Sequence, residues 1–250
     1  MAEPLLQAEA LVKRFGGLVA TDNVAIDVQP GEIHALIGPN GAGKTTLVSQ
    51  LTGNLRPDSG TIRFAGRDVT RLPTHARVRL GLARSFQITS VLREFTALDN
   101  AALAVQAHDG HSFRFLADIR RDQRLRDLAR RNLETVGLGP RAGVLASALS
   151  HGEQRQLEIA MALAVAPKLL LLDEPMAGMG IEESQRLVEL LRGLKQRCGM
   201  LLIEHDMDAV FALADRITVL VYGRAIASGA PDEIRGNAEV RQAYLGEEAS

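Results

Sequence analysis

The sequence predicts an α/β fold whose central sheet is largely parallel. Two short, continuous apolar runs, KLLLLDEP (168–175) and MLLIEH (200–205), are typical of strands that are buried on both faces. The segment between them, EESQRLVELLRGLKQR (182–197), has the apolar spacing of an amphipathic helix. A strand, a helix and a second strand in this order form a βαβ unit, in which the two strands run parallel.

The chain before this unit begins with predicted strands. Apolar or alternating segments at 5–15, 24–28 and 33–37 each predict a short strand, and TIRFAGRDV (61–69) predicts a further strand and a turn. A glycine-rich loop follows the third of these strands, and LVSQLTG (47–53) after the loop has a helical pattern. We therefore expect a β-rich opening with one helix.

A helical block and a short C-terminal part complete the pattern. Residues 96–166 have helical apolar spacing and contain an arginine-rich stretch at 120–131, so we expect a helical insertion. Residues 217–234 predict a strand, a Tyr-Gly turn, a strand and a proline-started helix, and residues 238–247 predict a terminal helix. The chain then divides into 1–87 and 168–236 as the core with its β region, 88–167 as a helical subdomain, and 237–250 as a C-terminal helix and tail.

The composition argues against several classes of protein. A formal net charge of −1 and a pI near 6.6 give no electrostatic footprint for nucleic acid, so we expect no nucleic-acid partner. The one cysteine, Cys198, cannot form an internal disulfide, which fits a reducing, cytosolic setting. No signal sequence is apparent and no apolar run approaches the ~20 residues that span a bilayer, so any membrane association is expected to go through a partner.

Residues 38–46, GPNGAGKTT, satisfy G-x-x-x-x-G-K-[ST] between a predicted strand and a predicted helix. Glycines let the backbone wrap closely, so that successive N–H groups and the helix N-terminus point at phosphate oxygens. We expect Lys44 to reach the β- and γ-phosphates and the Thr45 hydroxyl to bind Mg²⁺. The predicted nucleotide-binding residues of this loop are Gly38, Pro39, Asn40, Gly41, Ala42, Gly43, Lys44, Thr45 and Thr46.

Two carboxylates follow the buried run LLLLDEP. Asp173, at the end of the predicted strand, is placed to hold the Mg²⁺ shell, as the corresponding aspartate of P-loop ATPases does. Glu174 next to it is the natural activator of water, because a carboxylate there can orient the water that attacks the γ-phosphate or accept its proton. With the glycine-rich loop, these residues predict hydrolysis of a Mg²⁺-bound nucleotide.

A second phosphate-binding helix start is predicted in LSHGEQRQ (149–156). Ser150 lies at the N-terminal end of the predicted helix, so its hydroxyl and the free N–H groups of the helix form another anion site. The sequence therefore predicts two phosphate-binding helix starts but only one G-x-x-x-x-G-K-[ST] loop.

At this point the chain resembles the nucleotide-binding subunits of ABC transporters, whose signature LSGGQ is matched by LSHGEQ with His151 and Glu153 as departures. The resemblance covers essentially all of the chain. It implies a P-loop NTPase (RecA-like) core with an antiparallel β region and an inserted helical subdomain. It also implies that two chains pack head to tail around ATP and Mg²⁺, with Ser150, Gly152 and Glu153 of one chain covering the γ-phosphate bound by the other.

The resemblance also assigns roles that residue chemistry alone leaves open. Phe15, in KRFGG, matches the aromatic residue that stacks on adenine. Gln87, in RSFQ, matches the loop glutamine that meets Mg²⁺ and the transport partner, and His205, in LLIEHD, matches the switch histidine that contacts the γ-phosphate. The implied catalytic residues are Lys44, Gln87, Glu174 and His205, and the implied metal ligands are Thr45, Gln87 and Asp173.

Two positions depart from the family pattern. His151 replaces a glycine of the signature, and we interpret it as a tolerated side chain that points to solvent. Gly180 stands where many family members have an aspartate that bridges to the partner chain's nucleotide loop. The resemblance therefore supports the nucleotide site more strongly than it supports a contact from this position to the nucleotide loop of the partner chain.

Within the superfamily, the C-terminal run from Gly223 to Glu247, the segment LLIEHDMDAVFALADRI and the phrase ARSFQ resemble ATPases of branched-chain amino acid importers of the Liv type. This implies an ATPase that lies on the cytoplasmic, inner face of the membrane and energises uptake of branched-chain amino acids or related small polar solutes. The implied partners are the transmembrane permease subunits, an identical or related ATPase chain and, indirectly, a solute-binding protein.

Three alternatives remain open. The lipopolysaccharide-export ATPase shares the AYLG-like ending, and a non-transport ABC ATPase would act as a mechanical switch. A P-loop kinase of small molecules would lack the signature helix and the His205-type switch. We interpret the arginine-rich stretch 120–131 as a solvated helix face, because Asp122 and Asp127 are interleaved with the arginines. The segment 88–100 is expected to line a groove for a cytoplasmic helix of the permease.

Overall fold

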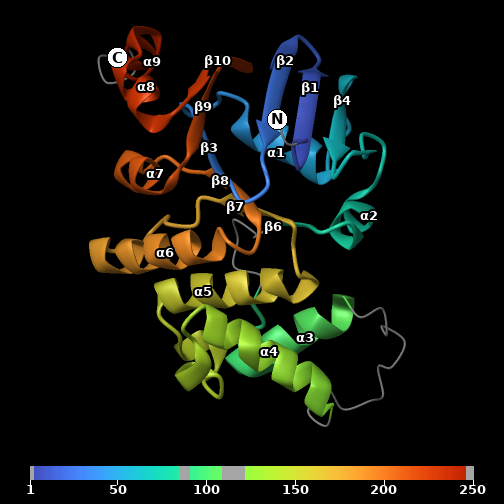
Figure 1. The fold of residues 1–250 in the computed structure, drawn as a ribbon, viewed down its shortest axis with the longest axis vertical. Helices are drawn as coiled ribbons and strands as arrows, with labels where there is room; N and C mark the ends of the chain where they lie inside the picture. Colours follow the sequence, from blue (N-terminus) through green and yellow to red (C-terminus); the bar gives the residue numbers. More distant parts are fainter. Residues whose placement is uncertain (1–2, 85–90, 109–121, 246–250) are drawn as a thin grey trace.

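The computed structural model describes residues 3–84, 91–108 and 122–245, and these form two sheets with helices around them (Figure 1). The smaller sheet is antiparallel and has the order β2-β1-β4-β5. Its strands are β1 (Leu6–Phe15), β2 (Leu18–Val28), β4 (Ser59–Phe64) and β5 (Arg67–Asp68).

The larger sheet has the order β10-β9-β3-β8-β7-β6 and is parallel from β9 to β6, with β10 antiparallel at one edge. Its strands are β3 (Ile33–Ile37), β6 (Leu82–Arg84), β7 (Leu169–Asp173), β8 (Gly199–Ile203), β9 (Arg216–Val221) and β10 (Arg224–Gly229). The α/β class with a largely parallel sheet and an antiparallel β region is therefore confirmed.

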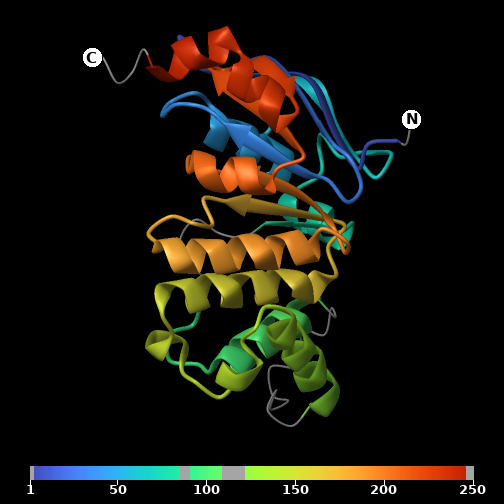
Figure 2. The same cartoon turned by 60° about the vertical axis from the view of Figure 1, so that its left-hand side comes forward.

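The helices lie in two groups. The first accompanies the sheets and consists of α1 (Lys44–Thr52), α2 (Thr74–Arg79), α6 (Ile181–Leu194), α7 (Met207–Leu213), α8 (Pro231–Gly236) and α9 (Ala238–Leu245). The second consists of α3 (Ala97–His108), α4 (Gln123–Thr135) and α5 (His151–Ala162). Figures 1 and 2 show α5 lying alongside α6, with α3 and α4 on its far side. The proposed division of the chain into a core, a helical subdomain and a tail stays a prediction.

The two apolar runs that predict buried strands contact a different core on each face. In β7, Leu169 and Leu171 pack with the antiparallel sheet and α1, whereas Leu170 and Leu172 pack with the helices on the other face. Successive side chains of a strand point to opposite faces, so a strand covered on both sides is apolar along its length, as β7 is from Leu169 to Leu172 before it ends in Asp173. All five residues of β7 and all five of β8 are buried.

The structure differs from the sequence prediction in two places. The block 96–166 was expected to be helical, but residues 136–150 contain only the short 3₁₀ turns Gly139–Arg141 and Ala146–Ala148. Gly137, at φ +81°, comes directly after Val136, the C-cap of α4, and ends the apolar spacing of a helix. The three-residue strand β6 was missed, because it is too short to produce a pattern.

A buried arginine supports the far end of α1. Arg77 of α2 is almost completely buried and its Nη1 donates hydrogen bonds to the carbonyl oxygens of Gln50 and Leu51, at 2.8 and 2.7 Å. These carbonyls belong to the last turn of α1, where backbone acceptors have no partner within the helix. Burial lowers the pKa of Arg77 to about 10, so the guanidinium remains charged at neutral pH and binds the negative end of the helix dipole.

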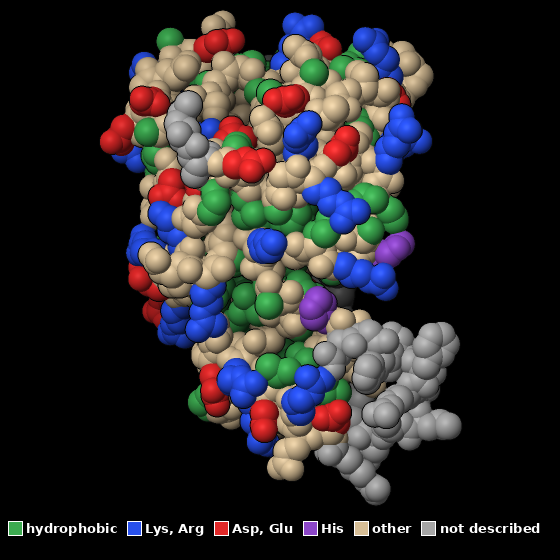
Figure 3. Space-filling model, turned by 45° about the vertical axis from the view of Figure 1, so that its right-hand side comes forward, with side chains coloured by type: hydrophobic (Ala, Val, Ile, Leu, Met, Phe, Trp, Pro, Cys, Tyr) green, Lys and Arg blue, Asp and Glu red, His purple; other side chains and the backbone are tan. Residues whose placement is uncertain are grey.

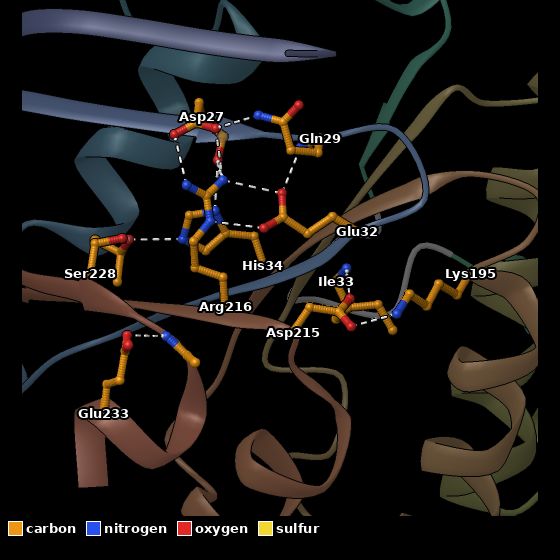
Figure 4. A network of polar contacts seen from close by, with 12 residues as sticks. Asp27, Gln29, Glu32, Ile33, His34, Lys195, Asp215, Arg216, Ser228 and Glu233 are labelled. Atoms are coloured by element: carbon orange, nitrogen blue, oxygen red, sulfur yellow. Dashed lines mark hydrogen bonds and ion pairs between the residues drawn. The ribbon is translucent and has the colours of Figure 1, made fainter. Parts of the chain in front are cut away.

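A buried polar network joins β2, β3 and β9 at the amino ends of β3 and β9 (Figure 4). His34 is buried, with Nδ1 2.6 Å from the carbonyl oxygen of Asp27 and Nε2 2.8 Å from Thr218 Oγ1. Arg216 donates to the carboxylates of Asp27 and Glu32, at 2.7 and 2.8 Å. Burial lowers the pKa of His34 below its ordinary value of 6.5, and the nearby charge of Arg216 lowers it further.

The free energy of unfolding is expected to decrease as the pH falls below about 6.5. In this range the unfolded chain protonates His34 whereas the folded chain resists protonation, so the unfolded state binds more protons. The stability that neutral His34 contributes is therefore fully present above the unfolded pKa and is lost as the pH falls toward the folded pKa. Urea denaturation at a series of pH values measures the effect.

Two variants separate His34 from other groups that titrate. His34→Gln is expected to be less stable at neutral pH but to lose much of the dependence on pH between about 7.5 and 5.5. His151→Gln changes an exposed histidine and is expected to keep the wild-type dependence. Equal slopes for the wild type and His34→Gln would show that the interpretation of His34 is wrong.

Candidate functional site

The segments that carry the predicted site emerge from one edge of the larger sheet. β3, β8 and β7 run parallel and side by side, and Asp173 at the end of β7 pairs with Ile203 at the end of β8. The segments after these strands begin at residues 38, 174 and 204. They therefore lie at the carboxyl edge of the sheet, which is where ligands bind in open α/β folds.

The loop after β3 is held tightly against β2. Gly43 has φ +102°, and a Cβ atom there would lie 2.2 Å from the carbonyl oxygen of Ala20. The position therefore requires glycine both for its backbone conformation and for space. Lys44, the first residue of α1, folds back over the loop, and its Nζ donates hydrogen bonds to the carbonyl oxygens of Gly38 and Pro39.

A cavity of about 490 Å³ opens beside this loop. It is lined by most of the predicted nucleotide-binding residues, from Asn40 to Thr46, together with Phe15 and Glu174. Phe15 is half-exposed at the end of β1, so its ring is accessible. The structure thus brings the glycine-rich loop, the predicted adenine-stacking residue and the predicted water activator to one cavity.

The cavity has four further lining residues that the sequence did not indicate, namely Leu18, Val19 and Ala20 of β2 and Tyr222. Tyr222 is strongly exposed in the turn between β9 and β10. The turn lies against the glycine-rich loop because the N–H of Gly223 donates to the carbonyl oxygen of Ala42 at 2.8 Å. The Tyr-Gly turn itself was visible in the sequence, but its proximity to the loop depends on the pairing of β9 with β3, which has no local signal.

Asp173 is buried at the end of β7 and forms an ion pair with Arg84, the last residue of β6. Arg84 Nη2 donates to Asp173 Oδ2 at 2.7 Å. Among the described contacts this engages only Oδ2, which leaves Oδ1 for a cation. The Asp173 carboxylate and the Thr45 hydroxyl are hard oxygen donors of the type that Mg²⁺ prefers, so the chemistry of these two residues is compatible with the predicted magnesium site. Gln87, the third predicted ligand, lies outside the described residues.

Glu174 and His205 approach each other from adjacent loops. His205 Nδ1 lies 3.8 Å from Glu174 Oε1, and both side chains are at least partly accessible. The backbone of Glu174 is in the left-handed region, at φ +48°, and its N–H donates to the carbonyl oxygen of Ile203 at 2.9 Å. The predicted water activator and the predicted switch histidine are therefore neighbours.

Ser150 begins α5 as its N-cap. Its Oγ accepts the N–H of Glu153 at 3.2 Å, and the Glu153 carboxylate accepts the N–H of Ser150 at 2.8 Å, which forms a capping box. The hydroxyl also lies 3.2 Å from Oε1 of Glu183 on α6. Ser150, Gly152 and Glu153 line a separate small cavity and none of them lines the nucleotide-loop cavity, so one chain keeps the two predicted phosphate sites apart.

The two positions that depart from the family pattern, His151 and Gly180, both lie near the start of α6. His151 is exposed, and its ring lies beside Gly178, where an added Cβ atom would be 3.5 Å from Cε1 of the imidazole. The side chain therefore contacts the segment after β7 as well as solvent. Gly180 is the residue before α6, in an extended conformation with φ −74°.

Residues 21–177 match the family described as ABC transporter, and residues 226–250 match the family described as branched-chain amino acid ATP-binding cassette transporter. One relative is the high-affinity branched-chain amino acid transport ATP-binding protein LivG of Escherichia coli, which is 41% identical over 99% of this chain and 100% of its own length. Another is the lipopolysaccharide export system ATP-binding protein LptB of Acidithiobacillus ferridurans, which is 36% identical over 98% of both chains.

A solved structure is similar over the same extent. The crystal structure of the ADP conformation of MJ1267, an ATP-binding cassette of an ABC transporter, superposes with a TM-score of 0.88 and 30% identity, covering 98% of this chain and 100% of that chain. Within residues 3–84, 91–108 and 122–245, no helix has the length and hydrophobicity needed to cross a membrane.

Gly43→Ala is expected to weaken nucleotide binding, and Gly41→Ala provides a matched control. Both glycines have left-handed φ values, +102° and +77°, so either substitution costs roughly 1–2 kcal/mol in backbone conformation. Only at Gly43 does the added methyl meet a backbone carbonyl, whereas space is open at Gly41.

We expect Gly43→Ala to lower the affinity for ADP by at least about tenfold, which corresponds to ~1.4 kcal/mol of binding free energy. Gly41→Ala is expected to have a smaller effect. Titration with a fluorescent ADP analogue measures both constants, and urea denaturation measures the accompanying loss of stability. Equal losses of affinity in the two variants would contradict this account of Gly43.

Proposed function

Because this chain belongs to the ABC transporter family of ATP-binding cassettes, we propose that it energises import of branched-chain amino acids or related small polar solutes through a separate membrane permease. The chain is an ABC-type ATPase subunit. The observation that carries its ATPase chemistry is the single cavity lined by Lys44, Thr45 and Glu174, with His205 next to Glu174. The near full-length similarity to LivG supports the proposed solute class.

The geometry supports a direct route for hydrolysis. ATP would place its phosphates against the N–H groups of the glycine-rich loop and the N-terminus of α1, with the base near Phe15. Bound Mg²⁺, held by Thr45 and Asp173, would neutralise charge on the β- and γ-phosphates. Glu174 would orient the attacking water and accept its proton, and His205 would contact the γ-phosphate.

The second phosphate site supports a cross-chain arrangement. Ser150 lies apart from the nucleotide-loop cavity of its own chain, so it would cover the γ-phosphate only in a second chain packed head to tail. ATP would then hold two chains closed, and hydrolysis with release of phosphate would let them open. The second chain can be identical or related.

An apolar cavity supports the permease as a partner. It has a volume of about 310 Å³ and lies between α2, β6, α3 and α5, next to Arg84 at the end of β6. Its lining includes the apolar side chains of Val78, Leu82, Ala104, Ala107, Met161, Ala162 and Val165. Figure 3 looks onto this side of the molecule and shows exposed hydrophobic side chains between the sheet-containing part and the helices. A cytoplasmic helix of the permease would dock here, which would place the chain on the inner face of the membrane.

A second candidate is the ATPase of a lipopolysaccharide export system, which the match to LptB favours. The two candidates share the site chemistry and differ in the permease. Co-purification from detergent-solubilised membranes tests the choice: importer permease subunits support the first candidate and an export permease supports the second. Recovery of neither would contradict both transport roles.

Glu174→Gln is expected to slow ATP hydrolysis by about 100-fold or more, which is the usual size of a general-base contribution. The amide still occupies the cavity but cannot accept a proton, so ATP binding is expected to persist and to stabilise a dimer. Phosphate release measures turnover, and gel filtration with ATP measures dimerisation. Glu182→Gln alters a strongly exposed carboxylate on α6 and is expected to retain the wild-type rate. Undiminished turnover in Glu174→Gln would remove it from this role.

Leu92→Glu and Phe95→Glu are expected to abolish permease binding and transport while the basal ATPase rate of the isolated chain stays unchanged. Both side chains are substantially exposed before α3, and a buried charge in a docking surface is costly. Thr61→Glu adds the same charge on β4, at the opposite end of the molecule, and serves as the control (Figure 1). Leu92 and Phe95 belong to the segment that was predicted to line the groove, and neither of them lines the apolar cavity. Normal transport in both variants would exclude residues 91–100 from the docking surface.

A further inference from the structure

Glu204, which follows β8, is the most deeply buried carboxylate next to the site. Its side chain has 0% exposure, and the one basic side chain that the structure describes near it is that of His205, whose Nδ1 lies 3.7 Å from Oε2. Burying a carboxylate is costly unless hydrogen bonds compensate for the lost water. The residues that supply these hydrogen bonds therefore indicate what the carboxylate holds.

The compensation comes from backbone N–H groups of two loops. Oε1 accepts the N–H of Met176, in the loop after β7, at 2.8 Å. Oε2 accepts the N–H groups of His205 and Asp206, in the loop after β8, at 2.9 and 3.4 Å. Hydrogen bonds to an ionised acceptor are about twice as strong as neutral ones. One carboxylate therefore links the loop that carries Glu174 to the loop that carries His205.

The link stands next to a strained backbone. Glu174 has φ +48°, a conformation that costs an L residue roughly 1–2 kcal/mol. Its own N–H donates to Ile203, its carbonyl oxygen accepts the N–H of Ala177, and the N–H of Met176 donates to Glu204. Without the hydrogen bond to Glu204, the segment after Glu174 loses its link to the loop after β8.

We propose that Glu204 is a positioning residue for ATP hydrolysis, which fixes Glu174 and His205 relative to each other by holding the backbone of both loops with one carboxylate. The inference rests on the proposed roles of Glu174 and His205 in the cavity. Glu204 acts through these two residues and not on the nucleotide itself, because its side chain is completely buried and both of its oxygens accept backbone N–H groups.

Glu204→Gln tests the carboxylate with almost no change of shape. An amide has one oxygen and one NH₂ group, so one of the two loops then faces a donor where it needs an acceptor. We expect kcat to fall by roughly 10-fold to 100-fold, the size produced by small misplacements of catalytic groups, while KM for ATP stays within about twofold. Glu204→Asp keeps the charge but is one methylene shorter and cannot reach both loops, so kcat should also fall.

Coupling to Glu174 distinguishes positioning from a general loss of stability. In a Glu174→Gln background, Glu204→Gln is expected to cause little further loss of hydrolysis, since the group that it positions is already inactive. Asp215→Asn is the matched control: its Oδ2 accepts the N–H of Ile33 at 2.8 Å at the opposite edge of the sheet. That variant should lower stability, keep kcat and show no coupling to Glu174.

Two outcomes overturn the inference. One is an unchanged kcat in Glu204→Gln, and the other is a full further loss of hydrolysis when Glu204→Gln is added to the Glu174→Gln background. If Glu204→Gln does not fold, Glu204→Asp is judged by the same two criteria. If the wild-type chain binds ATP but does not hydrolyse it, the proposed function is wrong. If the wild type hydrolyses ATP and Glu204→Gln does so at the same rate, only the inference about Glu204 is wrong.

Discussion

The parallel pairing of β3, β8 and β7 is the constraint on which the rest of the molecule depends. It brings three loops to one edge of the sheet, and these loops carry Lys44, Glu174 and His205. A parallel sheet of this kind is stable only when both of its faces are covered. The antiparallel sheet with α1 covers one face and α5 and α6 cover the other, so the architecture around the site follows from the need to bury β7 and β8 completely.

Polar contacts differ between the amino ends and the carboxyl ends of the strands in this sheet. At the amino ends of β3 and β9, the charges of Arg216, Asp27 and Glu32 satisfy one another around neutral His34. At the carboxyl ends the carboxylates are Asp173, Glu174 and Glu204, and among the described residues only Arg84 and His205 pair with them. The carboxylates therefore cluster at the carboxyl ends, where a cation is expected to bind. The polar contacts at the amino ends join β2, β3 and β9 to one another.

Features with a local pattern could be predicted from the sequence. The apolar runs of β7 and β8 and the glycine-rich loop before Lys44 can each be recognised from a few consecutive residues. Arg84, Tyr222 and Glu204 could not be found, because each gains its place by contact with a distant segment, as Arg84 does with Asp173 across 89 positions. The helical spacing of 96–166 was misleading at 136–150, where glycines outweigh the apolar pattern. The roles of the site residues stay predictions.

The separation of Ser150 from the nucleotide-loop cavity of its own chain has a consequence for reaction order. On the proposed pairing, a lone chain holds only half of each composite site, so hydrolysis by dilute isolated chains would rise with the square of their concentration. Two chains tethered on one permease would instead meet at an effective concentration set by the complex, which for short tethers is on the order of millimolar. Turnover would then be proportional to the number of assembled transporters, and unassembled chains would consume little ATP.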